Sequence, residues 1–269
     1  MGITRQGYYK HVKNEPERKR RDDLILSGIR RIRKHLNTVG GRKLQIMLKE
    51  KLAKSEVKVS RDHLFDLMRQ HNLFSKLSTR YCRTTNSKHG RRVWPNLLKD
   101  LEITRPNQAW VSDITYILTT TDFCYLSLVT DVYSRRIVGY HLSRHMYTED
   151  VMQAVINACN SVQPPEGLIH HSDKGSQYCS KKYSNFLKGK KIQISMTGPN
   201  HCYDNAIAER VNGILKLEFG LGSVIRDFAT AQKLVVDSIA LYNGERLHNS
   251  LGNVTPDSFY FKELAKNAA

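Results

Sequence analysis

The sequence has little that would anchor the chain in a membrane. Nowhere in its 269 residues is there an apolar run of about 18 residues, the length that a membrane-spanning helix needs. The first stretch, MGITRQGYYKHVKNEPERKRR, contains no hydrophobic region of the kind that defines a signal peptide. We therefore expect a cytoplasmic protein with no membrane partner.

Cysteine is scarce and scattered. No two cysteines form a Cys-x-x-Cys pair, and their number is odd, so the pattern indicates neither a disulfide framework nor a cysteine-based zinc site. We expect reduced thiols at Cys82, Cys124, Cys159, Cys179 and Cys202.

Acidic residues are rare in the first two-fifths of the chain. Residues 1–107 hold 27 Lys and Arg against 10 Asp and Glu, whereas residues 108–269 hold 16 against 15. Nearly all of the net charge of +18 therefore lies in the N-terminal part. A single charged run is usually a solvated surface, but an asymmetry of this length favours a module that binds a polyanion, above all nucleic acid.

The N-terminal part, residues 1–74, has helical patterning. We predict helices over 17–37 and 41–53 and a third helix capped by Ser60, with apolar residues at helical spacing in the last two. Two short helices with a basic outer face fit a helix-turn-helix whose second helix enters the major groove, where Arg61 and Arg69 would contact DNA. The alternative is a three-helix bundle with a basic surface.

Residues 75–107 are polar, basic and without regular periodicity, and Pro95 and Pro106 interrupt them. We predict a linker here. Its cations could follow DNA phosphates, with Tyr81 and Trp94 available for stacking, or the segment could be a solvated tether. The candidate phosphate contacts are Arg80, Arg83, Lys88, Arg91 and Arg92.

Residues 108–269 change to strands that later alternate with helices. AWVSDITYIL, FCYLSLVTDVYS and RIVGYHLS are three β-rich runs joined by short turns, which predicts an antiparallel meander. A helix near 148–160, a strand GLIHHSD, a helix near 180–188, a strand IQISM and a helix from Asp204 or Asn205 follow. The order predicts an α/β domain with a mixed sheet of about five strands flanked by helices.

Three carboxylates of this part occupy notable positions. Asp113 lies inside a strand, where aspartate is disfavoured. Asp173 closes a short strand, at the end where α/β sheets place their sites. Glu209 lies early in a helix, on the face opposite the apolar residues. Each residue alone has an ordinary explanation: a solvated strand residue, a turn or cap residue, and a charge near a helix N-terminus.

Together, the three carboxylates suit phosphoryl transfer with two metal ions. Two Mg²⁺ ions about 4 Å apart stabilise the attacking and leaving oxygens of an in-line displacement, and such hard cations prefer carboxylate ligands. Mn²⁺ is expected to substitute for Mg²⁺.

The spacing adds a resemblance. Thirty-five residues separate Asp173 from Glu209, and the chain resembles the transposases and integrases that have a ribonuclease-H-like core and an Asp, Asp, 35-residue, Glu signature. The segments that carry this resemblance are WVSDITYI, VTDVYSRRIVGY, HHSDKGSQYCS, GPNHCYDNAIAERVNGILKLE and YNGERLHNSLGNVTPDSF. With the N-terminal GITRQGYYK, they are similar to the catalytic second-frame product of bacterial insertion sequences that use two overlapping reading frames.

The resemblance implies an activity. Asp113, Asp173 and Glu209 would be the catalytic metal ligands of a DNA transposase. An activated water would cut at the element's end to expose a 3′-hydroxyl, which would attack another phosphodiester by direct transesterification.

The zinc-binding module of retroviral integrases is missing, because residues 1–107 contain a single cysteine, Cys82.

The resemblance also implies partners. They are double-stranded DNA, a homo-oligomer on two paired ends, and the first-frame product as a fusion or an associate. When bound to DNA, the protein would be associated with the nucleoid.

Further residues are candidates for contacts with DNA. Ser176, Gln177 and Tyr178 follow Asp173 and could contact the DNA end or simply form the loop. Asn205, Asn212 and Lys216 share the polar face of Glu209. We expect Asp131 to stabilise a turn and Asp204 to cap its helix. His171 could make a hydrogen bond within the fold or reach a phosphate. For four residues near the C-terminus we expect a mixture of structural and DNA-facing roles: Tyr242, Asn243, Arg246 and His248.

Two other functions remain open. A DNA-binding regulator with an inactive nuclease fold would have no need for three carboxylates, which argues against it. A nuclease without strand transfer is harder to separate from a transposase on sequence alone.

Overall fold

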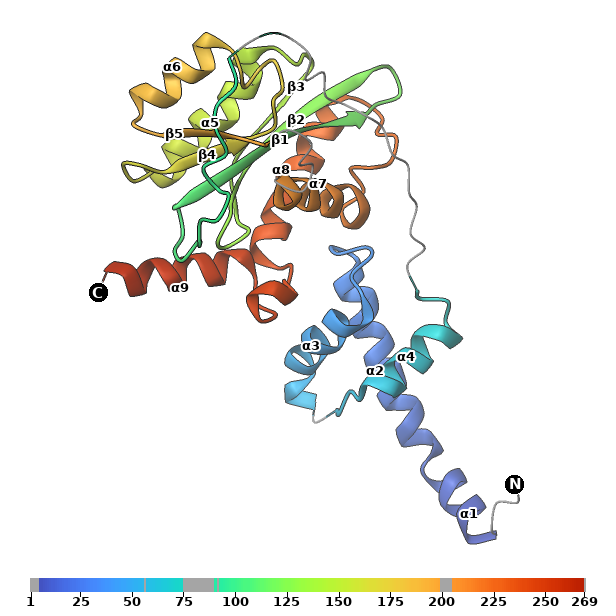
Figure 1. The fold of residues 1–269 in the computed structure, drawn as a ribbon. Coiled ribbons are helices and arrows are strands. Elements are labelled where there is room, and N and C mark those ends of the chain that lie inside the picture. The colour runs from blue at the N-terminus through green and yellow to red at the C-terminus, as the bar shows by residue number, and fades with distance from the viewer. Residues whose placement is uncertain (1–4, 56, 75–89, 91, 199–204, 269) are drawn as a thin grey trace. The chain divides into compact units, whose positions relative to one another are not determined.

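The computed structural model describes residues 5–55, 57–74, 90, 92–198 and 205–268. The chain divides into two compact units, Met1–Ser78 and Thr79–Ala269, drawn in Figure 1.

The N-terminal unit is helical. Its predicted helices are present, but the first of them ends at Arg33 rather than at residue 37. A preceding helix, Arg5–Lys13, was not predicted. The elements of the N-terminal unit are α1 (Arg5–Lys13), α2 (Glu15–Arg33), α3 (Gly41–Lys51), the 3₁₀ turn η1 (Ala53–Ser55) and α4 (Arg61–Gln70).

Apolar residues at helical spacing form the core of this unit. Ile25 and Ile29 of α2, Leu44 and Leu48 of α3 and Leu64 of α4 are all fully buried. Ser60 stands at the N-cap of α4 as predicted, although its side chain makes no capping hydrogen bond. The connection between α3 and α4, residues 52–60, is longer than the turn of about three or four residues typical of a helix-turn-helix.

The second unit is built on the predicted five-stranded mixed sheet. The strand order is β3-β2-β1-β4-β5. β1, β2 and β3 form the predicted antiparallel meander, whereas β4 pairs parallel with β1 and β5 pairs parallel with β4. The strands are β1 (Ala109–Leu118), β2 (Phe123–Asp131), β3 (Ile137–Ser143), β4 (Ile169–Ser172) and β5 (Gln193–Met196).

Helices cover both faces of this sheet (Figure 1). Successive residues of a strand point to opposite faces; accordingly, Trp110 packs with α5 and α6, whereas Val111 packs with Ala208 of α7. Gly139 lets α5 approach β3 closely, since a Cβ there would lie 2.6 Å from the Cβ of Ala158. The helices are α5 (Thr148–Val162), α6 (Lys181–Gly189), α7 (Ala206–Glu218), α8 (Phe228–Gly244), the 3₁₀ turn η3 (Asn249–Leu251) and α9 (Pro256–Ala268).

The prediction of a linker is wrong for residues 92–107, because these residues pack on the sheet of the second unit. The backbone N–H of Leu97 donates to Ser195 Oγ over 2.8 Å, and Met196 N–H donates to the Pro95 carbonyl over 3.2 Å. Leu98 and Ile103 pack against the apolar cluster that contains Val111. The first half of the linker lies almost entirely outside the described residues.

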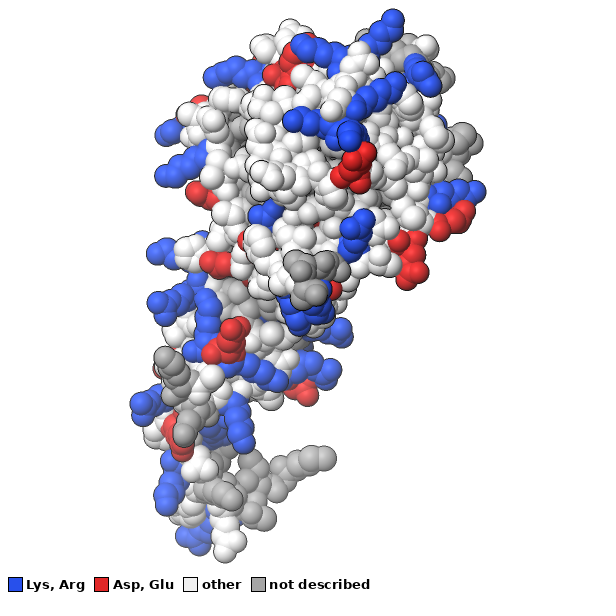
Figure 2. Space-filling view, turned by 90° about the vertical axis from the view of Figure 1, so that its left-hand side faces the viewer, with Lys and Arg blue, Asp and Glu red and all other residues white. Residues whose placement is uncertain are grey.

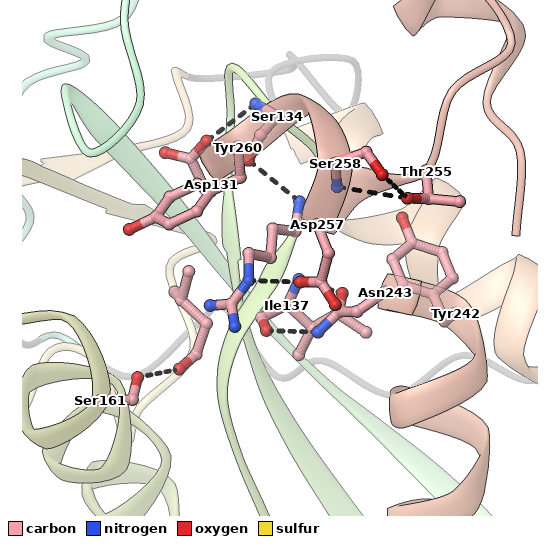
Figure 3. A network of polar contacts seen from close by, with 12 residues as sticks. Asp131, Ser134, Ile137, Ser161, Tyr242, Asn243, Thr255, Asp257, Ser258 and Tyr260 are labelled. Carbon is pink, nitrogen blue, oxygen red and sulfur yellow. Dashed lines mark hydrogen bonds and ion pairs between the residues drawn. The ribbon is translucent and has the colours of Figure 1, made fainter. Parts of the chain in front are cut away.

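Asp131 stabilises the turn after β2, as predicted (Figure 3). Its Oδ2 accepts hydrogen bonds from the N–H and hydroxyl of Ser134, at 2.8 and 2.5 Å. Its Oδ1 accepts from the backbone N–H of Asn107 over 2.7 Å. Both carboxylate oxygens are therefore used within the fold, and β2 ends at Asp131 rather than continuing to residue 134.

Membrane-spanning helices are absent from the described part of the chain: none of its helices is both long enough and apolar enough to cross a bilayer.

Candidate active site

Asp113 and Asp173 extend from two neighbouring parallel strands. In the register of β1 and β4, the last paired residues are Ser112 and Ser172. Asp113 is the next residue of β1, and Asp173 directly follows the last residue of β4, so the two carboxylates emerge side by side at the carboxyl end of β4. This end of an α/β sheet is where binding sites usually lie.

The helix that carries Glu209 is joined to β1 at two points. The side-chain amide of Asn212 donates to Asp113 Oδ2 over 2.8 Å, and that of Asn205 donates to the Ser112 carbonyl over 3.2 Å. Asn205 stands at the N-cap of α7 but makes no side-chain capping bond there. The predicted cap, Asp204, lies outside the described residues.

The environment of Asp113 concentrates negative charge. Burial raises the pKa of its carboxyl to about 7, and the neighbouring Asp173 carboxylate adds to the rise. The hydrogen bond from Asn212 favours the ionised form and lowers this pKa, while Glu209 raises it by a smaller amount. All three predicted carboxylates are therefore close enough to interact electrostatically.

A tight loop holds the carboxylate of Asp173. Its Oδ1 accepts a hydrogen bond from the backbone N–H of Gly175 over 2.9 Å. A Cβ at residue 175 would lie 3.0 Å from the same oxygen, so only glycine leaves the carboxylate its full space.

The three carboxylates are not drawn into a single tight cluster. Glu209 lies on an exposed turn of α7. Among the residues that the structure describes, no group of three His, Cys, Asp or Glu side chains is close enough to hold a metal ion. Like charges repel one another in a site of low dielectric, which disfavours a closer approach of the three groups by themselves.

Three of the predicted DNA contacts are buried and cannot meet DNA in this structure. Asn205 and Asn212 are 4% and 5% exposed and are directed at β1. Tyr178 is 2% exposed and packs edge-to-face against Tyr183, with ring centroids 5.4 Å apart. The prediction that these three side chains face DNA is therefore wrong: the asparagines fix the site from within, and Tyr178 belongs to the core.

The remaining residues predicted near the site are partly exposed. Ser176 donates to Gln177 Oε1 over 3.2 Å, and the Gln177 amide donates to the Met146 carbonyl over 3.0 Å. The ammonium of Lys216 lies 5.0 Å from the centroid of the Tyr116 ring.

The more distant predicted contacts have local partners. Arg61 and Arg69 are exposed on α4 and form ion pairs with Asp62 and Asp66, at 2.9 and 2.6 Å. The guanidinium carbon of Arg92 lies 4.3 Å from the centroid of the Trp94 ring. The other linker cations, Arg80, Arg83, Lys88 and Arg91, lie outside the described residues.

Two buried histidines lie behind the site on opposite faces of β4, as the alternation predicts. His170 Nε2 is 2.7 Å from Ser112 Oγ and 3.1 Å from the Tyr183 hydroxyl. Burial lowers the pKa of His170 to about 3, so this ring is neutral. His171 Nδ1 is 2.8 Å from Ser195 Oγ, and His171 is fully buried, which places it away from any bound phosphate. The sequence carried no signal for these serine partners, which come from other strands.

Comparison with known proteins gives consistent matches. The integrase core domain matches residues 103–202 and, in a second version of that family, residues 190–256. A 31 kDa protein of the insertion element IS600 from Shigella sonnei is 38% identical over 96% of this chain and 95% of its own length. The transposase for insertion sequence element IS629, also from Shigella sonnei, is 31% identical over 91% of this chain and 82% of its own length.

Two further matches extend the comparison. The transposase InsF for insertion sequence IS3A from Escherichia coli is 34% identical over 74% of this chain and 69% of its own length. Among solved structures, an intasome of simian T-cell lymphotropic virus aligns at a TM-score of 0.51 with 17% identity, over 80% of this chain and 70% of that chain. The structural match shows the fold alone.

The fold and the adjacent aspartates define a ribonuclease-H-like core of the integrase class. With the relatives above, the chain belongs to the family of bacterial insertion-sequence transposases of the DDE superfamily, and it is an enzyme of the DDE transposase and integrase type.

Proposed function

We propose that this enzyme cuts DNA at the ends of an insertion sequence and joins the resulting 3′-hydroxyl to target DNA by direct transesterification, with Mg²⁺ as its cofactor. The observation that carries the proposal is the adjacency of Asp113 and Asp173 at the end of the β1–β4 register, with α7 fixed against Asp113 by Asn212.

The residues present suit a divalent cation. The donors are carboxylate oxygens, which Mg²⁺ and Mn²⁺ prefer. Burial is the main cause of the raised pKa of Asp113, and the neighbouring Asp173 carboxylate adds to it; a bound cation would offset both effects by favouring the ionised carboxylates. We propose Asp113, Asp173 and Glu209 as the ligands of two ions. When bound, two such ions activate the attacking oxygen and stabilise the leaving oxygen of an in-line displacement.

The protein's own groups hold this arrangement. Asn212 fixes the Oδ2 side of Asp113, and the Gly175 N–H fixes Asp173 Oδ1. Glu209 would supply the third carboxylate from the exposed turn of α7. Lys216, two turns beyond Glu209 on the same helix, would place its ammonium against a phosphate of the bound strand.

The N-terminal unit would hold the DNA duplex. Figure 2 shows Lys and Arg side chains gathered over its visible face. We propose that this surface contacts phosphates, with Arg61 and Arg69 of α4 among the contacts, and that Arg80, Arg83, Lys88, Arg91 and Arg92 extend it along the chain. Ser176 and Gln177 would contact the DNA end beside Asp173.

The proposed reaction also bears on the oligomeric state of the protein and on where it acts in the cell. Two element ends must be held together for transposition, so we propose a homo-oligomer on paired ends, with the first-frame product as a further partner by fusion or association. The protein would act in the bacterial cytoplasm, on the nucleoid when bound to DNA.

A strand-transfer assay with labelled element ends tests the proposal. We expect cleavage and joining with Mg²⁺, and loss of both in Asp113→Asn, Asp173→Asn and Glu209→Gln, with folding and DNA binding retained. Asp131→Asn is the matched control: it also replaces an aspartate at a strand end of the same sheet, but one whose oxygens serve the turn. It should keep its metal-dependent activity at temperatures where the protein remains folded.

A second control lies beside Glu209. Asp204→Asn keeps a side chain that can cap a helix, so it should retain substantial activity. An active Glu209→Gln beside an inactive but folded Asp204→Asn would show that the third ligand is misassigned. Cleavage without joining would favour a nuclease that lacks strand transfer. DNA binding without cleavage would favour a DNA-binding regulator with an inactive nuclease fold.

A further inference from the structure

Two exposed aromatic rings lie on the loop between β3 and α5. Tyr147, at the N-cap of α5, is 63% exposed, more than any other large hydrophobic side chain in the described residues. The ring of His145, also exposed, lies 5.1 Å from the Tyr147 ring between centroids, at an interplanar angle of 30°. The two rings are tilted against each other and form one small aromatic patch that is open to solvent.

This surface borders the loop that carries Asp173. β3 and β4 both run parallel to β1, so the loops that follow β3 and β4 leave the sheet at the same end. The two loops are bonded to each other: the amide of Gln177 donates to the carbonyl of Met146, the residue between His145 and Tyr147, over 3.0 Å. The aromatic pair is therefore held beside the loop that follows Asp173.

The exposure of the pair has no explanation within the fold. A tyrosine ring left in water adds no packing to the core, and adjoining exposed apolar groups can mark a site where a ligand binds. A ligand that suits such an exposed aromatic patch is another flat aromatic group, which can stack on one of its rings. Bases inside a duplex are stacked on one another and offer no free face, so only a base that has left its stack could bind here.

We propose that His145 and Tyr147 form a stacking platform for one unpaired base of the DNA strand whose phosphate lies at Asp113 and Asp173. The inference rests on the proposed function and adds to it a subsite for a base that is splayed out of the duplex. Stacking of this kind tolerates every base, because each has a π-face. The platform therefore stabilises an opened DNA end without reading its sequence.

Fluorescence tests the platform directly. The probe is a duplex with a short single-stranded tail that carries 2-aminopurine, whose emission is quenched when it stacks. The full-length protein should quench the tail and bind the tailed duplex more tightly than a blunt one. Tyr147→Ala should lose the quenching and weaken binding of the tailed duplex by about tenfold, in line with the loss of one base–aromatic stack.

Matched variants separate stacking from other effects. Tyr147→Phe keeps the ring and should keep the quenching. Phe261→Ala removes a comparably exposed aromatic ring, 56% exposed on α9, and should leave the quenching unchanged. His145→Ala should reduce it. Full quenching of the tail by Tyr147→Ala would overturn the proposal.

A second measurement uses the reaction. If the platform acts by holding an opened base, the end-cleavage defect of Tyr147→Ala should shrink on a substrate whose terminal base pair is already mismatched. An equal defect on paired and mismatched ends would contradict the platform. A wild-type protein that quenches the probe but cleaves no end would contradict the proposed function and leave the platform standing, so the two failures are distinguishable.

Discussion

The side-chain amide of Asn212 donates a 2.8 Å hydrogen bond to Oδ2 of Asp113. This bond joins α7 to the central strand of the sheet, at the position where β1 leaves its pairing with β4. Because Glu209 lies one turn earlier on α7, the same helix carries the carboxylate that we propose as the third ligand and orients that of Asp113. The orientation of the site therefore depends on the packing of α7.

Replacing Asn212 should impair the chemistry more than the fold. Asn212→Ala removes a hydrogen bond to a charged group, and such a bond contributes about 1.5–3 kcal/mol. If the same free energy is lost from the transition state, the rate of end cleavage should fall by roughly ten- to a hundredfold. Asn212→Asp adds a negative charge beside Asp113 and should be more damaging. Measurement of cleavage and of thermal unfolding on the same samples separates activity from stability.

Asn212→Ala should also shift the pH dependence of end cleavage, in a direction that follows from the hydrogen bond. The amide donates to the ionised carboxylate and lowers the pKa of Asp113, so its removal raises that pKa. A smaller fraction of Asp113 is then ionised at a given pH, and the acid limb of the pH–rate profile should move to higher pH. A shift to lower pH would contradict the role given to this bond.

Activity should depend on the kind of divalent cation. Mg²⁺ and Mn²⁺ should support cleavage, whereas Ca²⁺ should suppress it, because Ca²⁺ accepts the same oxygens with a looser coordination that does not hold the in-line geometry. Cleavage is measured with each ion and in excess chelator. Undiminished cleavage in excess chelator would contradict the proposal that two metal ions are required.

The N-terminal unit should bind duplex DNA mainly through phosphates. Residues 1–78 carry 20 Lys and Arg against 8 Asp and Glu. Each phosphate that the unit neutralises should contribute about −0.9 to the slope of log affinity against log salt. Residues 92–269, with 19 against 17, should bind the same duplex weakly. Equal affinity of the two fragments, or binding by residues 1–78 that is insensitive to salt, would refute this division of labour.

Local patterning predicted most of the sheet and its helices. The first strand was predicted at Ala109–Leu118 and observed there, because its β-branched and aromatic residues suit a strand. α1, in contrast, was missed, since RQGYYKHVK has no regular apolar stripe. Residues 92–107 were taken for a linker because an irregular segment has no period, although Leu97 and Ile103 pack on the core.

The candidate site shows where sequence reasoning stops. Asp113, Asp173 and Glu209 could be selected from their spacing, but the burial of Asn212 and Tyr178 depends on how the elements pack. Asn212 meets Asp113 across 99 positions, and Tyr178 packs on rings that the fold alone brings together. A polar residue on a helix face can point to solvent or to a carboxylate of the sheet, and only the packing of α7 decides which.

Arg246 provides the last prediction, because the sequence left it between a structural and a DNA-facing role. It is 2% exposed, and its guanidinium binds both carboxylate oxygens of Glu218, at 2.6 and 2.7 Å. Glu218 is the last residue of α7, so this ion pair holds the end of the helix that carries Glu209. The geometry therefore favours the structural role.

Removing one partner of a buried ion pair leaves an uncompensated charge. Arg246→Ala should lower the free energy of unfolding by about 3–5 kcal/mol, measured by urea denaturation. Arg246→Lys should have a smaller effect, because lysine keeps the charge but loses the two-pronged contact. The double variant Arg246→Met with Glu218→Leu should recover much of the loss, since apolar groups can replace a buried pair at little cost. If Arg246→Ala instead left unfolding unchanged and weakened DNA binding, Arg246 would face DNA, and the packing of α7 would have to be held by other contacts.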